Sequence, residues 1–157
     1  CQEHYGENSL YCVRVVYTLF TARLHEATNE GANMTLKMLA EMTHDKIPVK
    51  ANQFLYKAIL INSMFAMQVM RTEQEVMNLK VTLNGVFTAQ VAYCEGDKNH
   101  PFLEEVISLM STLFESINDP RSAVYMWHLL LAIQEKMFGE TKREMFTTFK
   151  KIGSLYF

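Results

Sequence analysis

The residues best suited to chemistry are scattered along the chain. The chain has five histidines, and none forms the His-Glu-x-x-His pattern that holds zinc on a helix. They are His4, His25, His44, His100 and His128. Cys1-x-x-His4 together with Cys12 could supply three zinc ligands, but no fourth ligand follows at a zinc-finger spacing. We therefore expect no metal.

The remaining reactive side chains have structural explanations. The run from Lys150 to Ser154 lacks the Gly-x-x-x-x-Gly-Lys order of a phosphate-binding loop. The adjacent acids Glu104 and Glu105 favour the start of a helix, where negative charge is stabilising. His128 is better suited to a partly buried packing position than to a catalytic base. The sequence thus predicts a protein that is not an enzyme and binds no cofactor.

Three cysteines at wide spacing do not form a disulfide framework. We expect Cys1, Cys12 and Cys94 to be free thiols in a reducing, cytoplasmic compartment. The chain opens without a signal-peptide pattern and without Met, and it stops abruptly. These features lead us to expect a fragment of a longer intracellular protein.

The composition excludes several classes of protein. The 157 residues are 49% hydrophobic and 20% charged, which is too apolar for a disordered chain. No apolar run reaches the roughly 18 residues of a membrane span. With 15 basic and 17 acidic side chains, the net charge of −2 gives no basic footprint for nucleic acid. We expect neither a membrane nor a nucleic-acid partner.

Sparse Gly and Pro between long apolar periodic stretches predict an all-α protein. Pro101 and Pro120 suit the first position of a helix, and Thr72-x-x-Glu75 has the pattern of a capping box, as does the run from Thr141 to Glu144. The patterns predict seven helices, at residues 9–28, 32–44, 49–70, 73–95, 101–117, 120–138 and 142–157.

One segment also has the pattern of a β-hairpin. Asn84-Gly85 lies between β-branched residues, which is a hairpin signal. Yet apolar residues recur through the same segment at helical spacing, and the capping box begins the same stripe. They are Val76, Leu79, Leu83, Val86, Phe87 and Val91. We predict a helix in which Gly85 marks a close helix crossing.

An internal repeat joins two segments near the end of the sequence. Four residues match four others in type, as large, large, small and aromatic, at a constant offset of 42. They are Ile107, Met110, Ser111 and Phe114, matching Phe149, Ile152, Gly153 and Tyr156. Between the two sets, Ala123 is predicted as the small residue of a second helix and Trp127 as its large partner. Such periodicity is the signature of a repeat architecture.

This pattern resembles the tetratricopeptide repeat (TPR) family, in its 42-residue kinesin light chain form. The matching features are His100-Pro101, the run Leu130-Leu131-Ala132-Ile133-Gln134-Glu135-Lys136-Met137-Phe138-Gly139, and Ile152-Gly153-Ser154-Leu155-Tyr156. The resemblance implies a right-handed α-solenoid of antiparallel helix pairs in a single domain, residues 1–157. Its parts would be degenerate helix pairs at 1–99, a clear repeat at 100–141 and the first helix of a further repeat at 142–157. An irregular helical bundle is the alternative.

The resemblance also implies protein binding on the concave face, which is lined by the first helix of each pair. Carried over position by position, the partner-binding residues would be Glu105, Ser108, Leu109, Thr112, Glu115, Thr147, Lys150, Lys151 and Ser154. Kinesin light chain repeats usually have Asn at the positions of Leu109 and Lys151. An amide that grips a peptide backbone is absent here, so a helical partner or docking inside a large assembly is the better expectation.

Two functions are compatible with this sequence. One is a protein–protein interaction scaffold, which analogy alone extends to a cytoskeletal or ciliary assembly. The other is an accessory helical domain of a larger enzyme, such as a SET–MYND-type lysine methyltransferase. We also expect further repeats or another chain at the C-terminal end, covering Phe149, Ile152 and Tyr156.

Methionine is abundant, with 11 residues in the chain. Two helical stripes contain Met34, Met38 and Met42, and Met64, Met67 and Met70. Methionine fills irregular gaps in cores, and it also forms adaptable binding surfaces. We expect the core position for both stripes, with a Met-lined partner groove as the alternative.

Overall fold

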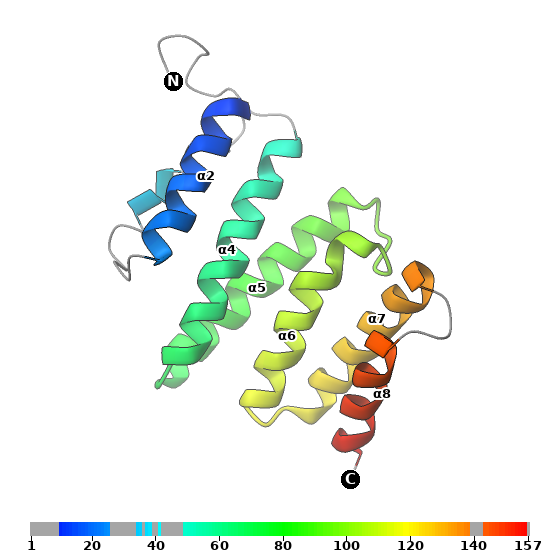
Figure 1. Ribbon diagram of the computed structural model, residues 1–157. Helices are drawn as coiled ribbons and strands as arrows, with labels where there is room; N and C mark the ends of the chain where they lie inside the picture. Colours follow the sequence, from blue (N-terminus) through cyan, green and yellow to red (C-terminus); the bar gives the residue numbers. More distant parts are fainter. Residues whose placement is uncertain are drawn as a thin grey trace. The chain divides into compact units, whose positions relative to one another are not determined.

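The computed structural model describes residues 10–25, 34–35, 37–38, 41, 49–138 and 143–156, and these residues form helices and the short connections between some of them, with no strand (Figure 1). The elements are α2 (Leu10–His25), α4 (Val49–Val69), α5 (Glu73–Tyr93), the 3-10 helix η1 (Pro101–Leu103), α6 (Glu104–Ser116), α7 (Pro120–Phe138) and α8 (Arg143–Leu155). The all-α prediction is therefore confirmed for this part of the chain. The chain divides into two compact units, Cys1–Asn62 and Ser63–Phe157.

The predicted helix boundaries hold to within a few residues. The description covers six α-helices where the sequence predicted seven, because the predicted helix at 32–44 lies mostly outside the described residues. The capping box at Thr141 also lies outside them. The prediction of one helix at 101–117 was wrong in detail, since Pro101 begins a 3-10 turn from which α6 continues.

The first unit has a small core between α2 and α4. Val13, Phe20 and Ala58 are buried there, and the rings of Tyr17 and Phe54 lie with their centroids 5.4 Å apart. Tilted aromatic pairs at this separation add to the stabilisation that burial provides. This core joins the two helices through side chains that lie far apart in the sequence.

Cys12 in α2 is buried and disulfide-bonded, whereas Cys94 is a free thiol. The expectation of three free thiols was therefore wrong at Cys12, whose partner lies outside the described residues. The inference of a reducing compartment depended on free thiols, because disulfides persist in oxidising environments. Because Cys12 is disulfide-bonded, the cysteines no longer support a reducing compartment.

The segment with the hairpin signal is helical throughout. Thr72 accepts a hydrogen bond from the backbone of Glu75, and the Glu75 side chain accepts from the backbone of Thr72, so the capping box is complete. From this start, α5 buries Leu79, Leu83 and Val86 along one side. The helical stripe therefore outweighs the local turn preference of Asn-Gly.

Gly85 lies in the middle of α5 but at no close crossing. A Cβ atom built there would meet nothing within 4 Å, so the expectation of a close helix approach was wrong. Glycine inside a helix costs about 1 kcal/mol relative to alanine. In α5 nothing in the packing offsets that cost.

Two helices end in the same left-handed motif. The backbone N–H of Gly96 donates to Val91 and that of Asp119 donates to Phe114, each at 2.9 Å. These are the long hydrogen bonds of Schellman caps, which place one residue at positive φ. That residue is Glu95 in the first cap and Asn118 in the second, both with φ 56°. The caps bring α5 to η1 and α6 to α7 through short connections.

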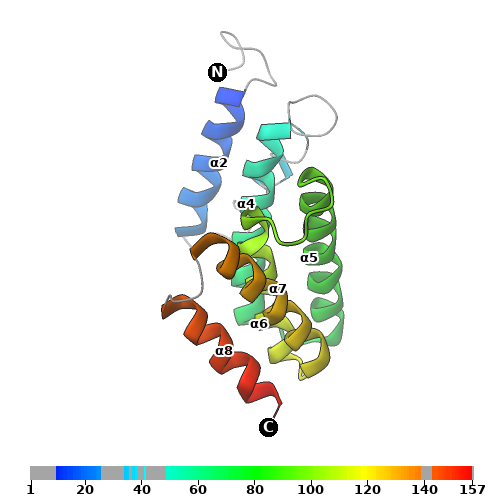
Figure 2. The ribbon, with the colours of Figure 1, turned by 90° about the vertical axis from the view of Figure 1, so that its right-hand side faces the viewer.

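In the second unit α7 lies beside both α6 and α8, while α6 also packs on α5 (Figures 1 and 2). Asp119 caps the start of α7 by accepting from the Ser122 backbone at 3.2 Å. A buried polar pair joins α7 to α8, in which the Thr148 hydroxyl donates to Gln134 Oε1 at 2.7 Å. The Asp119 cap fixes where α7 begins after α6, and the Thr148–Gln134 pair holds α8 against α7. Ile152 of α8 is also buried, so the expectation that it lacks cover was wrong.

The methionine stripes are more exposed than expected. Met34, Met38 and Met64 are exposed, and Met67 and Met70 are half-buried. The core assignment was therefore wrong for the three exposed residues, while Met42 lies outside the described residues. Unbranched, polarizable methionines on a surface suit contacts that adapt to a partner.

We predict that Gly85→Ala raises the free energy of unfolding by about 0.5–1 kcal/mol, because α5 gains helix propensity without a clash. The matched control is Gly96→Ala, which should destabilise, because Gly96 has φ +87°. Urea unfolding followed by circular dichroism measures both. A Gly85→Ala variant that is less stable than wild type would show that a neighbour does approach this position.

We predict a pH-dependent role for Asp119. The hydrogen bonds from Ser122 lower the pKa of Asp119. A lowered pKa in the folded state stabilises the protein above the unfolded pKa, about 3.9, and this stabilisation is lost as pH falls through the folded pKa. Asp119→Ala should therefore cost about 1 kcal/mol at pH 7. The difference from wild type should narrow below pH 4 in urea titrations.

The control for this measurement is Asp119→Asn, which keeps a capping acceptor but does not titrate. The difference between the alanine and asparagine variants should be nearly constant with pH. A gap between wild type and Asp119→Ala that is the same at pH 7 and pH 3 would contradict the assignment.

Candidate functional site

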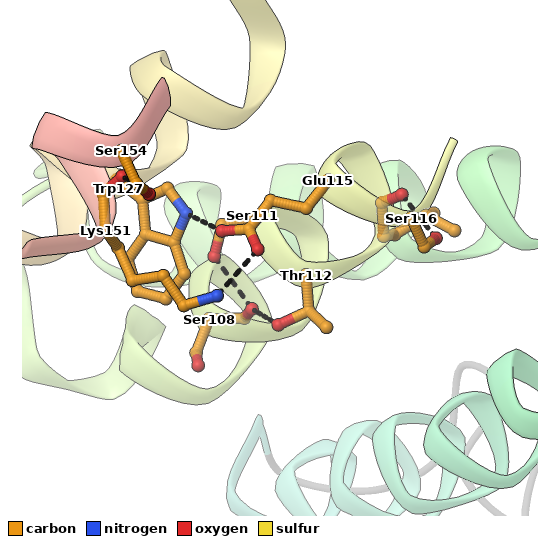
Figure 3. Close-up of polar contacts among 9 residues, drawn as sticks. Ser108, Ser111, Thr112, Glu115, Ser116, Trp127, Lys151 and Ser154 are labelled. Carbon is orange, nitrogen blue, oxygen red and sulfur yellow. Dashed lines mark hydrogen bonds and ion pairs between the residues drawn. The ribbon is translucent and has the colours of Figure 1, made fainter. Parts of the chain in front are cut away.

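Three side chains from α6, α7 and α8 meet around one carboxylate. Glu115 Oε1 accepts a hydrogen bond from the indole Nε1 of Trp127, and its Oε2 lies 2.8 Å from Lys151 Nζ. Figure 3 shows Lys151 alongside the Trp127 ring, with both nitrogens directed at the same carboxylate. The ammonium nitrogen is 6.0 Å from the ring centroid. We call these three residues the Glu115 cluster.

The cluster is part buried and part open. Trp127 is 8% exposed, whereas Lys151 is exposed and Glu115 is intermediate. An exposed ion pair contributes about 0–1 kcal/mol, so burial of the indole dominates the energetics of the cluster. The lysine covers the ring, and the carboxylate satisfies the one indole N–H.

The hydroxyl groups near the cluster bond to their own helices. The backbone carbonyl of Ser108 accepts from Ser111 Oγ at 2.8 Å and from Thr112 Oγ1 at 3.0 Å. In α8 the Ser154 hydroxyl donates to the carbonyl of Lys151 at 2.8 Å (Figure 3). Ser111 is buried, so only the exposed hydroxyls of Thr112 and Ser154 can accept a further hydrogen bond from a ligand.

The residues predicted to bind a partner all lie on α6 or α8. The exposed members are Glu105, Thr112, Thr147, Lys150, Lys151 and Ser154. The half-buried members are Ser108, Leu109 and Glu115. The structure brings one pair of them together across two helices, Glu115 with Lys151. The side chains of Glu105, Thr147 and Lys150 make no hydrogen bond or ion pair within the described residues.

Two contacts of this region were missed in the sequence. Trp127 was predicted as a packing residue, and its hydrogen bond to Glu115 was not foreseen. The ion pair between Asp97 and Lys136, at 2.8 Å, was also missed, and it joins the turn after α5 to the end of α7. Neither contact has a local sequence signal, because the partners are 12 and 39 residues apart.

The titratable groups do not suggest an acid–base pair. The hydrogen bond from Lys136 is the main cause that lowers the pKa of Asp97, and burial raises the pKa of the Cys94 thiol. His128 is exposed, so its expected partial burial was wrong. Within the described ranges, no three His, Cys, Asp or Glu side chains lie together as a metal ion would require.

Helix length and hydropathy bear on the membrane expectation. None of the helices in the described part of the chain combines the length and the apolar character that crossing a bilayer requires.

No family model, no curated protein and no solved structure matches this chain.

We predict that Trp127→Ala lowers the free energy of unfolding by about 3–5 kcal/mol, as for other buried aromatic residues. Trp127→Phe keeps most of the apolar contact but leaves Glu115 without its indole donor, so a smaller loss is expected. Urea unfolding of both variants makes the comparison. A loss below about 1 kcal/mol for Trp127→Ala would contradict the packing role.

Proposed function

We propose that this chain is a non-enzymatic, TPR-like scaffold that binds a protein partner on the face formed by α6 and α8. The first support is the 42-residue repeat, whose first copy falls within α6 and whose second copy lies in α8 except for Tyr156, which directly follows that helix. The second is that successive helices from α5 to α8 pack on one another, as in a chain of helix pairs.

The observation that carries this proposal is the ion pair between Glu115 and Lys151. These two residues come from equivalent helices of the two repeats, and the family resemblance places both on one face. A bridge of 2.8 Å between them supports a continuous surface over α6 and α8. A helix or an extended segment of a partner would lie across such a surface.

The chemistry of this face favours a partner with both apolar and acidic groups. Leu109 is half-buried and offers an apolar contact among polar neighbours. Lys150 is exposed and has no ion-pair partner within the described residues, so it can attract a carboxylate. Thr112 and Ser154 add hydroxyl groups that can accept a hydrogen bond. A helical partner with an apolar stripe and an acidic edge fits this combination.

Site-specific photo-crosslinking tests the proposal in cells that express the chain. We expect a photoreactive phenylalanine at Thr112 to give a discrete partner adduct, because Thr112 is exposed on the proposed face. Leu109→Asp should reduce the yield of that adduct at least fivefold, since it places a charge at the apolar contact.

The matched control places the same photoreactive group at Met77, an exposed residue of α5. Equal adducts at Thr112 and Met77, or no effect of Leu109→Asp, would refute the assignment of the binding face. Circular dichroism of each purified variant must match wild type, so that a lost adduct reports binding and not unfolding.

A further inference from the structure

The connection between α5 and α6 is closed by a histidine that acts as a hydrogen-bond acceptor. His100 Nδ1 accepts from the backbone N–H of Phe102 at 3.2 Å, and it thereby caps η1, from which α6 continues. A ring nitrogen accepts only when it carries no proton, so the single ring proton lies on Nε2. The cap therefore requires the uncharged imidazole. We call residues 97–102 the His100 turn.

Protonation of this imidazole removes the cap. In an imidazolium both ring nitrogens are donors, so Nδ1 would meet the N–H of Phe102 as one donor facing another. Histidine is the side chain whose charge ordinarily changes between about pH 5 and 8. His100 is exposed, so a proton can reach the ring from solvent while the helices stay packed.

A carboxylate in the same turn offers the imidazolium another partner. The backbone N–H of His100 donates to the carbonyl of Asp97 at 3.4 Å, which keeps the two residues close. The hydrogen bond from Lys136 is the largest cause that lowers the pKa of Asp97, and the charge of His100 lowers it further. The two side chains are thus near enough to attract each other when His100 is charged.

The Asp97 carboxylate already has partners on both oxygens. Oδ2 lies 2.8 Å from Nζ of Lys136 on α7, and Oδ1 accepts from the backbone of Asn99 at 2.9 Å. An imidazolium at His100 would compete with Lys136 for this carboxylate. Because the Asp97–Lys136 ion pair joins the His100 turn to α7, that competition bears on how the turn is held.

Other titratable and charged groups lie at the ends of the elements that pack on η1, which are α5, α6 and α7. They are Tyr93 and Cys94 at the end of α5, Glu95 and Lys98 in the connection, Glu104 at the start of α6, and Glu135 and Lys136 near the end of α7. The group on which the charge of His100 acts is Asp97.

We propose that the His100 turn is a pH-sensitive switch. At neutral pH the uncharged imidazole caps η1 while Asp97 holds Lys136. On acidification the imidazolium releases the N–H of Phe102 and pairs with Asp97, and Lys136 is freed into solvent. The rings of Tyr93 and Phe102, whose centroids are 5.6 Å apart, carry the change to the end of α5.

An NMR titration of the isotope-labelled whole chain from about pH 8 to 5 tests the switch. We expect the Phe102 amide and the Lys136 side chain to shift with the same midpoint as the His100 ring. His100→Asn keeps a capping oxygen but cannot titrate. In this variant the pH-dependent shift of the Phe102 amide should be at least fivefold smaller.

The matched control is His128→Asn, which replaces another exposed histidine, on α7, and should leave the Phe102 response unchanged. Asp97→Asn separates the two halves of the switch. It should abolish the response of Lys136, while the Phe102 amide still follows the His100 ring because the cap is still lost.

A Phe102 amide that stays in place while the His100 ring titrates would overturn the proposal, and the wild-type chain alone decides this. A Lys136 side chain that does not respond in wild type would refute the exchange at Asp97. Equal shifts of Phe102 in wild type and His100→Asn would assign the response to another group. None of these outcomes depends on a partner, so the switch can fail without the proposed binding face.

Discussion

The second unit depends on one constraint, which is that α7 has apolar residues on two sides and must be covered on both. Ala123 and Ile133 are fully buried, and Leu130 is nearly so. A helix that is apolar on more than one side is stable only inside a core. α6 and α8 supply that cover. α6 packs in turn on α5, whereas Phe146 and Phe149 of α8 remain exposed.

The Glu115 cluster has a different role from the apolar packing. Burial of Trp127 provides most of the stabilisation that the Glu115 cluster contributes, but burial has little directionality. The indole N–H and the ammonium group of Lys151 give the contact a direction, because both must reach the same carboxylate. The cluster therefore orients α6 and α8 about α7, and it does so at the edge of the surface proposed to bind a partner. The residues proposed for binding therefore also take part in the packing of α6, α7 and α8.

The sequence predicted what short-range chemistry determines. The capping box at Thr72, the helix start at Pro120 and the buried stripe through Leu83 depend on residues within a few positions of one another. Predictions from the sequence were wrong where a residue's environment depends on contacts with residues far away in the chain. Nothing local shows that Gly85 faces open space, that Met64 is exposed or that Cys12 is disulfide-bonded. The sequence named the residues of the candidate binding face. It could not show that Glu115 contacts Trp127 and Lys151, because these contacts form only when the three helices pack together.

The buried hydrogen bond between Thr148 and Gln134 has a consequence for how α8 can move. Apolar burial has no directionality, so it specifies the register of α8 on α7 less strictly than a hydrogen bond does. If α8 slid along α7 by one turn, both polar groups would stay buried without a partner, at about 1–3 kcal/mol for each. The pair therefore acts as a register lock. A displacement of α8 along its axis would therefore carry α7 with it.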